Sequence, residues 1–326
     1  MSEILLSAKH LKKYYQISSS TLFSSHANRG IVKAVDDITL DIPRGKTLSL
    51  VGESGCGKST LGRTLINLID PTEGEVLFNG KNIYAFNAQE EKAFRKAVSI
   101  IFQDPYASLN PRMKVRDLIG EPLLTHGMKA KKERYERVNE LMKITGLKAE
   151  YANRYPHQFS GGQRQRIGIA RALALNPSLI VCDEAVSALD VSIQAQILNL
   201  LKQLQRDFNL TYLFISHDLS VVRYVSDEVY VMYLGQIVEA GTPKALFEKP
   251  IHPYTQFLIN AVPIADPSIR DREKMILEGD LPSAINPPSG CRFRTRCPYA
   301  TEICANSCPK LITQGERKFA CHHPLM

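Results

Sequence analysis

Short, strongly apolar runs mark the parts of the chain that we expect to be buried strands. Residues 47–51, 178–182 and 211–215 form three such runs, each bounded by polar or turn-forming residues. An amphipathic stretch at 192–208 separates the second run from the third, as expected for neighbouring parallel strands joined by a crossover helix. The pattern predicts an α/β core built on a parallel sheet.

A glycine-rich turn at 52–57 follows the first of these strands, and an amphipathic helix is predicted at 58–68. This order of strand, loop and helix is typical of a nucleotide-binding core. Upstream of it, residues 1–50 are predicted to form short strands and turns. A polar, serine-rich stretch at 18–30 interrupts them; we interpret it as a loop and assign it no function.

Two later segments change the pattern. Between residues 113 and 171 apolar positions recur at helical spacing, with Gly146 as a stop signal, so we expect an α-helical block inserted into the core. After about Pro263 the chain is rich in proline, glycine and cysteine and has little periodicity. We therefore predict a large domain over residues 1–263 that contains a helical subdomain at about 104–175. A small irregular Cys-rich C-terminal domain is predicted over residues 264–326.

The composition agrees with a globular protein that does not cross a membrane. The chain has 326 residues, of which 44% are hydrophobic and 23% are charged, enough for one large domain and an appendage. Its apolar runs are far shorter than the roughly 20 residues that span a bilayer. The N-terminus lacks a long apolar stretch followed by a small-residue cleavage site. We expect a cytoplasmic protein.

Cysteine and charge are concentrated near the C-terminus. Five of the seven cysteines lie between Cys291 and Cys321, and a reducing cytoplasm argues against structural disulfides. The net charge is +8, and residues 285–326 hold six basic side chains against two acidic ones. A solvated basic face, attraction to nucleic acid and attraction to anionic lipid are all compatible with this excess.

The glycine-rich turn matches the spacing of a phosphate-binding loop. Glycines let the backbone curl so that N–H groups and a helix N-terminus face phosphates, and Lys58 neutralises charge on the outer phosphates. Ser59 supplies a hydroxyl for Mg²⁺, whereas Cys56 is interpreted as a small filler within the loop. The predicted ATP-binding residues of this segment are Gly52, Ser54, Gly55, Cys56, Gly57, Lys58, Ser59 and Thr60.

An acidic pair follows the strand at 178–182. In a chain that already has a phosphate-binding loop, two carboxylates at the end of a parallel strand have separate roles. Asp183 is expected to hold Mg²⁺, and Glu184 is expected to polarise the attacking water. Without that loop, a helix cap or a solvated turn would be the better interpretation.

Further motifs resemble those of the ATP-binding cassette (ABC) family, in the family's order and approximate spacing. Residues 159–163, Phe-Ser-Gly-Gly-Gln, resemble the signature sequence Leu-Ser-Gly-Gly-Gln, and residues 187–190, Ser-Ala-Leu-Asp, resemble the D-loop. By this resemblance the site residues are the adenine-stacking Tyr15, the Q-loop residue Gln103, the signature residues Ser160, Gly161, Gly162 and Gln163, the D-loop residue Asp190 and the switch residue His217.

The resemblance implies a fold and a mechanism. The fold is the P-loop ABC nucleotide-binding domain, with a parallel sheet core, an antiparallel β subdomain and an inserted helical subdomain. Gln103 joins Ser59 and Asp183 around Mg²⁺, while Glu184, His217 and Gln103 are the catalytic residues. Two such chains pair head to tail, so that the signature of one closes over ATP held by the other.

Two positions depart from the family pattern. Phe159 replaces the usual leucine of the signature, which leaves its serine and glycines intact. Ala185 follows Glu184 where the family usually has proline, which frees φ and restores an N–H group. We expect an active site in which turnover can be altered by this change.

The C-terminal sequence resembles one subfamily in particular. His-Pro-Tyr-Thr at 252–255 and Phe-Arg-Thr-Arg-Cys-Pro at 293–298 are similar to segments of dipeptide and oligopeptide importer ATPases of the second subunit type. The resemblance implies a peripheral ATPase on the cytoplasmic face of the cell membrane. Its implied partners are a second ABC ATPase in a heterodimer, two membrane permeases and an extracytoplasmic peptide-binding protein, with no nucleic acid. Related importers carry nickel or metal chelates.

The cysteines of this region suggest a metal site. Crowded thiols in a segment with little core point to a metal ion or cluster, and zinc is the main alternative to iron and sulfur. The usual zinc pattern has two closely spaced cysteine pairs, which is not the spacing here. The family resemblance implies a [4Fe–4S] cluster on Cys291, Cys297, Cys304 and Cys321. Cys308 lies at a variable position, and Arg292, Arg294 and Arg296 are candidates to offset the charge of a cluster.

Two other kinds of protein compete with a transporter subunit. One is a soluble, non-transport ABC ATPase that acts in DNA repair or on ribosomes. Such proteins usually carry two cassettes or long coiled-coil insertions, and this chain has one phosphate loop and no heptad run. The other is a regulatory iron–sulfur protein with a vestigial cassette, in which Glu184→Gln would change nothing.

Overall fold

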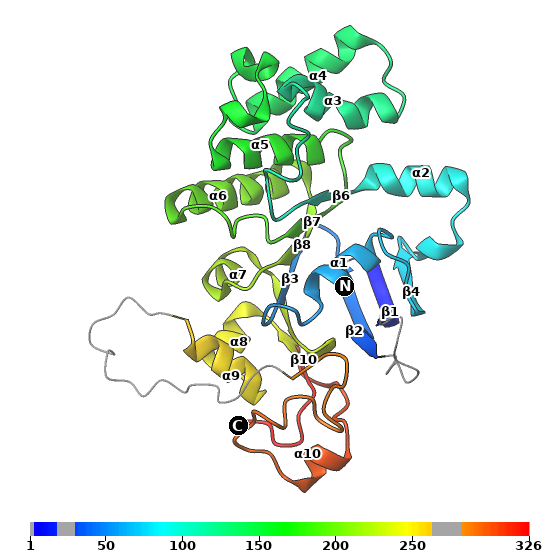
Figure 1. Cartoon of the computed structure of the whole chain (residues 1–326), viewed down its shortest axis with the longest axis vertical. Helices are drawn as coiled ribbons and strands as arrows, with labels where there is room; N and C mark the ends of the chain where they lie inside the picture. Colours follow the sequence, from blue (N-terminus) through cyan, green and yellow to red (C-terminus); the bar gives the residue numbers. More distant parts are fainter. Residues whose placement is uncertain (1–2, 18–29, 263–281, 326) are drawn as a thin grey trace, which may run out of the picture. The chain divides into compact units, whose positions relative to one another are not determined.

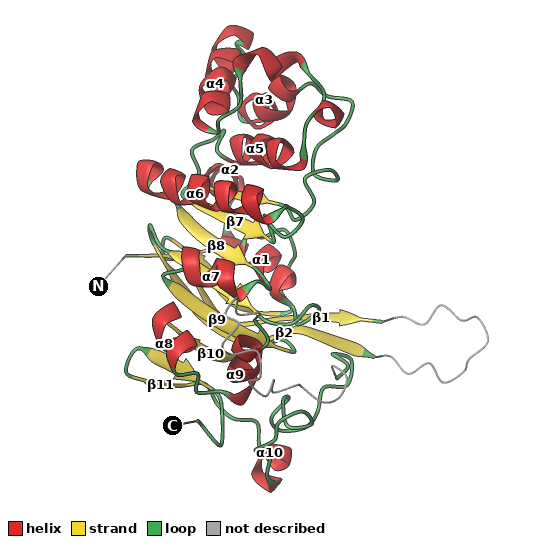
Figure 2. Cartoon of the chain, turned by 90° about the vertical axis from the view of Figure 1, so that its left-hand side faces the viewer, coloured by secondary structure: helices red, strands yellow, loops and turns green. Residues whose placement is uncertain are grey.

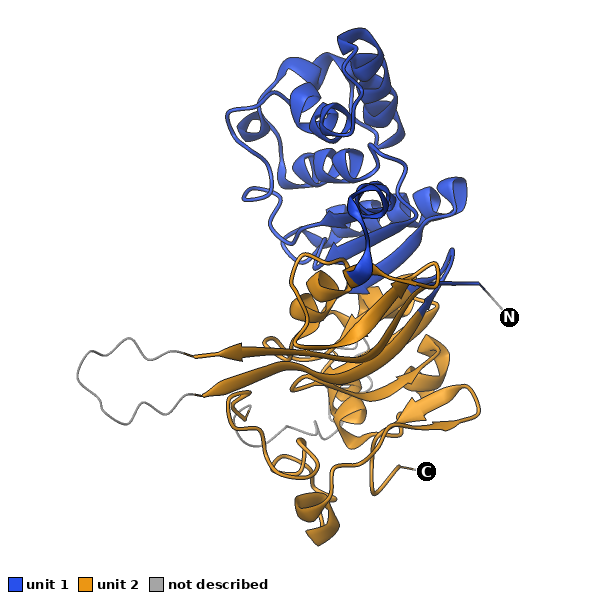
Figure 3. Cartoon of the chain, turned by 90° about the vertical axis from the view of Figure 1, so that its right-hand side faces the viewer, with its two compact units in different colours: residues 1–5, 42–47, 85–215 blue, residues 6–41, 48–84, 216–326 orange. Residues whose placement is uncertain are grey.

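The computed structural model describes residues 3–17, 30–262 and 282–325. The chain divides into two compact units, shown in different colours in Figure 3. Unit 1 comprises residues 1–5, 42–47 and 85–215, and unit 2 comprises residues 6–41, 48–84 and 216–326. The predicted loop at 18–30 lies outside the described residues except for its last residue. The predicted domain boundary after residue 263 lies outside them as well and stays a prediction.

Unit 1 contains the expected parallel strands. Strand β7 (Leu179–Asp183) lies between β6 (Val98–Ile101) and β8 (Thr211–Ile215), and both pairings are parallel. Every residue of β7 and β8 is buried, which explains their continuous apolar runs. The amphipathic α6 (Val191–Phe208) connects these two strands. The predicted strand at 211–215 and the crossover helix are confirmed, the helix beginning one residue earlier than expected.

A helical block is inserted between β6 and β7, as the periodicity predicted. Helix α3 (Val115–Thr125) packs against both α4 (Lys131–Ile144) and α5 (Gly161–Ala172), as Figure 1 shows. Helix α4 ends before Gly146, whose φ of +73° favours glycine. The remaining helical elements of unit 1 are α2 (Ala88–Ala97) and the 3₁₀ turns η2 (Ala149–Asn153) and η3 (Pro156–Gln158).

Unit 2 begins with an antiparallel sheet whose strands are longer than predicted. Strands β1 (Ile4–Gln16) and β2 (Ile31–Pro43) each have 13 residues, so the expectation of short strands at 1–50 was wrong. The adjacent Lys12 and Lys13 lie within β1 and are both half-buried. The sheet has the order β2-β1-β4-β5, in which β4 is Glu73–Phe78 and β5 is Lys81–Asn82.

A second sheet of unit 2 carries the glycine-rich loop. Strand β3 (Thr47–Val51) runs parallel to β9 (Glu228–Tyr233), and β10 (Gln236–Gly241) returns antiparallel to β9. From the end of β3 the chain enters the loop and then α1 (Lys58–Leu65), which ends three residues earlier than predicted. The other helical elements are the turn η1 (Ile83–Ala85), α7 (Leu219–Val225), α8 (Pro243–Glu248) and α9 (Pro253–Asn260).

The C-terminal segment, residues 282–325, is built onto this sheet. Its strands β11 (Ile312–Gln314) and β12 (Arg317–Phe319) form a hairpin, and β12 pairs antiparallel with β10. Apart from this hairpin and the short α10 (Glu302–Asn306), the described segment consists of turns and loops. Figure 2 shows how little regular structure it has compared with α8, α9 and the strands beside them.

An aromatic cluster anchors the C-terminal segment in unit 2. The ring of Phe293 is 1% exposed and lies 5.3 Å from that of Tyr233 and 5.4 Å from that of Tyr254, measured between ring centres. Tyr233 and Tyr254 are themselves in edge-to-face contact at 4.6 Å. Burial of such a ring contributes about 2–3 kcal/mol. The segment therefore shares the hydrophobic core of unit 2, which the sequence did not indicate.

No helix within the described ranges is both long enough and apolar enough to cross a bilayer.

Candidate active site

The predicted ATP-site residues are divided between the two units. Unit 2 holds Tyr15, the loop at 52–60 and His217. Unit 1 holds Gln103, the signature at 160–163, Asp183, Glu184 and Asp190.

Close backbone packing explains two of the glycines in the phosphate loop. A Cβ atom on Gly57 would lie 1.9 Å from the carbonyl oxygen of Ala34, and one on Gly52 would lie 2.1 Å from that of Met232. Gly57 also has a φ of +105° and forms the N-cap of α1. The loop is therefore held against β2 and β9 by backbone contacts that no larger residue permits.

Lys58 lies inside the curl of this loop. Its Nζ donates to the carbonyl oxygens of Gly52 at 2.8 Å and Glu53 at 2.9 Å, and the residue is buried. These bonds hold the ammonium group at the helix N-terminus, where backbone N–H groups also point. Cys56 is buried beside it, with its Sγ 3.8 Å from Lys58 Nζ, and burial raises the pKa of its thiol. This environment agrees with the interpretation of Cys56 as a filler.

Glu184 and Gln103 meet in unit 1. The Nε2 group of Gln103 donates to a carboxylate oxygen of Glu184 at 2.8 Å, although 81 residues separate them. Glu184 has a φ of +50°, an unusual value for a residue with a side chain. Its N–H group donates to Ile215 in β8 at 3.0 Å, and its carbonyl oxygen accepts from the N–H of Ser187 at 3.2 Å. The turn after Glu184 therefore keeps its hydrogen bonds even though Ala185 stands where the family usually has proline.

Asp183 and Asp190 flank this turn. Asp183 is the last residue of the buried β7 and is itself 3% exposed, so its carboxylate is presented at the carboxyl end of a parallel strand. Asp190 is exposed at the N-terminus of α6, where its carbonyl oxygen accepts from Gln194 at 2.8 Å. A carboxylate at a strand end is a suitable oxygen ligand for Mg²⁺.

The signature sequence forms the N-terminus of α5. Ser160 is the N-cap, and its side chain and that of Gln163 complete a capping box. A Cβ atom on Gly162 would lie 2.4 Å from the side chain of Ile193 in α6, so this position needs a glycine. Phe159 is buried, as the leucine it replaces would be. The exposed end of this 12-residue helix offers N–H groups and a positive dipole to an anion.

The two neighbouring tyrosines of β1 differ in their surroundings. The hydroxyl of Tyr14 donates to the carboxylate of Asp36, and burial followed by this bond raises its pKa. Tyr15 is 38% exposed, and Lys13 Nζ lies 5.1 Å from the centre of its ring. An exposed ring is available for stacking on a base, which favours Tyr15 over Tyr14. His217 is also exposed, just after the end of β8.

The sequence did not indicate that side chains of α9 and of the C-terminal segment hold the phosphate loop. Arg296 donates to both carboxylate oxygens of Glu53, at 2.8 and 3.1 Å, and Tyr254 Oη accepts from the N–H group of Glu53 at 2.9 Å. Nearby, Arg292 contacts the carboxylate of Asp36 and the carbonyl oxygen of Leu234. The only sequence signal was the presence of an acidic residue inside a loop that binds phosphate.

Each of the three C-terminal arginines has a partner in the structure. Arg292 and Arg296 pair with carboxylates of the cassette, and Arg294 donates to the carbonyl oxygen and hydroxyl of Ser289. The suggestion that the three arginines offset the charge of a cluster is not tested by these pairings and stays a prediction. Asp36 and Glu53 balance the charges of two of the three arginines.

The four cysteines predicted as ligands share one neighbourhood but are not arranged as a metal site. Burial is the main cause that raises the pKa of Cys321 to about 11, and the thiols of Cys291, Cys297 and Cys304 raise it further. The N–H of Cys291 donates to the carbonyl oxygen of Cys304 at 2.8 Å. Within residues 3–17, 30–262 and 282–325, however, no three His, Cys, Asp or Glu side chains are placed to hold a metal ion.

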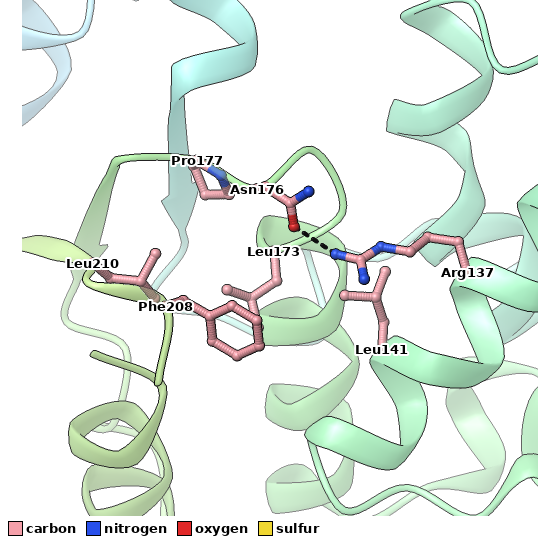
Figure 4. Close-up of a pocket in the computed structure, with 7 residues that line it drawn as sticks. All are labelled: Arg137, Leu141, Leu173, Asn176, Pro177, Phe208 and Leu210. Carbon is pink, nitrogen blue, oxygen red and sulfur yellow. Dashed lines mark hydrogen bonds between the residues drawn. The ribbon is translucent and has the colours of Figure 1, made fainter. Parts of the chain in front are cut away.

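A cavity in unit 1 lies apart from all of these residues. It has a volume of about 90 Å³ and is lined by side chains of α4, α6 and the turns between elements, among them Leu141, Leu173 and Phe208. At the rim of the cavity, Arg137 donates to the side-chain oxygen of Asn176 at a distance of 2.5 Å, a bond that is drawn in Figure 4. Ligand pockets usually exceed about 300 Å³, so this space is too small for a nucleotide.

Comparison with known proteins identifies the family. A model described as "ABC transporter" matches residues 35–187, and one described as "Oligopeptide/dipeptide transporter, C-terminal region" matches residues 238–304. The oligopeptide transport ATP-binding protein AppF of Bacillus subtilis is 53% identical over 98% of this chain and 97% of its own length. The dipeptide transport ATP-binding protein DppF of Haemophilus influenzae is 50% identical over 98% and 96%.

A solved structure supports the same conclusion. The ATP-binding cassette MJ0796, in a dimeric post-hydrolysis state bound to ADP and Pi, superposes with a TM-score of 0.64 at 30% identity. The match covers 73% of this chain and 98% of MJ0796. With the phosphate loop, the acidic strand end and the signature helix in place, the chain belongs to the ATP-binding cassette family of transport ATPases.

Proposed function

We propose that this chain is the ATP-hydrolysing subunit of an ABC importer and powers the uptake of dipeptides or oligopeptides from the cytoplasmic face of the cell membrane. The observation that carries the proposal is the full-length similarity, about 50%, to ATP-binding proteins of oligopeptide and dipeptide transport. The match of residues 238–304 to the C-terminal region of such transporters supports the choice of cargo.

The residues of the site have separable tasks in hydrolysis. Lys58 and backbone N–H groups of the loop, other than that of Glu53, which donates to Tyr254, bind the phosphates. The exposed ring of Tyr15 stacks on the adenine. Ser59 and Asp183 would hold Mg²⁺, with Gln103 contributing, and the ion would neutralise charge on the phosphates. Glu184 polarises the attacking water, and the hydrogen bond from Gln103 orients its carboxylate. His217 completes the γ-phosphate contacts.

A second ATPase subunit is needed to complete each site. The N-terminus of α5, with Ser160 and the glycines after it, offers hydrogen-bond donors to the γ-phosphate of ATP held by the other chain. Asp190 lies on the exposed D-loop, where it can contact that chain. The full assembly proposed is a heterodimer of ATPases, two permeases and an extracytoplasmic peptide-binding protein, in which closure of the cassettes drives alternating access.

Reconstitution tests this function. The chain, its partner ATPase and the permeases are placed in vesicles with the peptide-binding protein, and uptake of labelled dipeptides and longer peptides is measured with ATP. Uptake that requires ATP and is abolished by Glu184→Gln supports the proposal. Transport of a nickel chelate without peptide uptake would contradict the cargo, and purification of the chain only with nucleic acid would contradict the transporter role.

We also propose a [4Fe–4S] cluster on Cys291, Cys297, Cys304 and Cys321. The support is the family resemblance and the shared neighbourhood of the four thiols, although their present arrangement does not form a metal site. No step of ATP hydrolysis depends on it. Iron and labile sulfide are assayed after anaerobic purification, with Cys308→Ser as a control outside the ligand set. One equivalent of zinc without iron would show that the alternative metal is correct.

A further inference from the structure

The phosphate loop contains a charge that opposes its ligand. Glu53 follows Gly52 directly, and its carbonyl oxygen accepts a hydrogen bond from Lys58 Nζ at 2.9 Å. An unpaired carboxylate in this position would repel the phosphates of ATP and compete for Lys58. Some other group must therefore hold Glu53 and balance its charge.

Arg296 of the C-terminal segment is that group. Its Nη1 and Nη2 atoms donate to Oε2 and Oε1 of Glu53 at 2.8 and 3.1 Å, which is the bidentate arrangement that makes arginine–carboxylate pairs strong and specific. The side chains of Arg296 and Glu53 are 7% and 27% exposed, so water screens the pair only partly. The pair joins positions 243 residues apart in the sequence.

Tyr254 fixes the backbone of the same residue. Its hydroxyl accepts from the Glu53 N–H group at 2.9 Å, and its ring is fully buried against Tyr233 and Phe293. Phe293 lies three residues before Arg296, so one aromatic cluster holds both the tyrosine and the segment that carries the arginine. Glu53 is therefore held through its N–H group by Tyr254 and through its carboxylate by Arg296.

We infer that Arg296 and Tyr254 are positioning residues for the phosphate loop, and that through Glu53 the C-terminal segment sets the affinity of the site for ATP. Both act through Glu53 rather than on the reacting atoms. This role is additional to those of the ATP-site motifs. Tyr254 and Arg296 lie in the two C-terminal segments that resemble peptide-importer ATPases, and that resemblance gave neither residue a part in ATP binding. It rests on the proposed function only in that the loop binds ATP.

The test uses charge to separate positioning from simple support. Arg296→Met removes the charge and the donors but keeps most of the volume, and leaves Glu53 unpaired. We expect the Kd for MgATP of the purified full-length chain to rise on the order of tenfold. The double variant Arg296→Met with Glu53→Gln removes the repelling carboxylate as well, and we expect it to recover most of that loss. The increase in Kd of the single variant should shrink as salt rises.

Arg294→Met is the matched control, because Arg294 lies two residues away and bonds only within the C-terminal segment in the described structure. We expect its Kd to match that of the wild type. Tyr254→Phe provides a second route that keeps the ring packing, and we expect it to weaken ATP binding about threefold. It is informative even if Arg296→Met does not fold, because it removes only the hydroxyl that accepts from Glu53.

The outcomes separate the two ideas. Wild-type affinity in both Arg296→Met and Tyr254→Phe would overturn the inference and leave the ATPase function standing. A double variant as weak as Arg296→Met would also overturn it, since loss of mere structural support, or of the neighbouring cysteine site, is not repaired by removing a carboxylate. Absence of MgATP binding by the wild-type chain would instead overturn the function on which the inference rests.

Discussion

The phosphate loop of unit 2 and the catalytic edge of unit 1 are constructed in opposite ways. Both ends of the loop are packed so closely that a Cβ atom added to Gly52 or Gly57 would meet a backbone oxygen at about 2 Å, and Lys58 is buried within it. The catalytic edge, meaning Glu184 with Gln103, Ser187 and Asp190, consists of exposed or half-buried turns. Glu184 is hydrogen-bonded there to Gln103, Ile215 and Ser187, and its φ is positive.

This difference follows from what each part has to do. Phosphate binding requires backbone N–H groups fixed in advance, so that little entropy is lost when the anion arrives. Hydrolysis requires a carboxylate that water and a partner chain can reach, which close packing would prevent. A positive φ at Glu184 costs on the order of 1 kcal/mol or more, and the bonds to Ile215 and Ser187 offset it.

The largest expected effect comes from removing the charge at the catalytic edge. Glu184→Gln preserves shape and an oxygen that can accept from Gln103, but it cannot act as a general base. We expect kcat for phosphate release by the reconstituted transporter to fall at least about 100-fold, while the Kd for MgATP changes little. Glu136→Gln, an exposed change on α4, is the control. Full turnover in Glu184→Gln would assign the general base to another residue and support a vestigial cassette.

The complementary change breaks the packing of the loop. Gly57→Ala forces a Cβ atom to within 1.9 Å of the Ala34 carbonyl oxygen at a φ of +105°. We expect this to destabilise the fold by about 2–4 kcal/mol and to weaken MgATP binding at least tenfold. Gly80→Ala is matched to it, with a φ of +78° but open space around the new atom. Equal effects of the two changes on unfolding and on ATP titration would contradict a role for close packing.

A smaller change tests the orientation of Glu184. Gln103→Ala removes the Nε2 donor, and we expect kcat to fall roughly tenfold with little change in binding. Gln103→Glu places a second carboxyl group where that donor was. Two carboxyl groups at hydrogen-bond distance do not both lose their protons readily. The acid side of its pH–rate profile should therefore move to higher pH. Identical profiles for the two variants would show that Gln103 does not orient Glu184.

The sequence predicted those parts of the fold whose signal is local. The buried runs at 47–51 and 211–215 are the observed β3 and β8, because continuous apolar residues have few alternatives to a covered parallel strand. The length of β1 was missed because charged residues interrupt its apolar positions, so that no continuous apolar run marks it. Gly57 was expected from the motif, but the Ala34 oxygen that demands it could not be read from the sequence.

The candidate site shows the same division. Its residues are predicted from motif spacing and family resemblance, and the structure places Gln103 in hydrogen-bond contact with Glu184. The pair of Arg296 and Glu53 was missed because 243 residues separate its members and no local pattern links the two segments in which they lie. Long-range ion pairs depend on how the chain returns to the loop, which is a property of the whole fold.

The smallest predicted effect concerns the support of the phosphate loop by α9. His252 caps this helix, accepting from the N–H of Tyr254 at 3.0 Å, and burial lowers its pKa to about 3. In the unfolded chain this imidazole binds a proton below about pH 6.5, whereas in the folded chain it stays neutral down to about pH 3. Its contribution to the unfolding free energy is therefore complete above pH 6.5 and declines as the pH falls towards 3. His252→Asn keeps a capping oxygen without titrating. Between pH 7.5 and 5.5, the wild type should lose about 1 kcal/mol more unfolding free energy in urea than the variant. Equal losses in the two proteins would mean that His252 accepts a proton within the fold. The environment of α9 beside the loop would then be open to water, as the catalytic edge is.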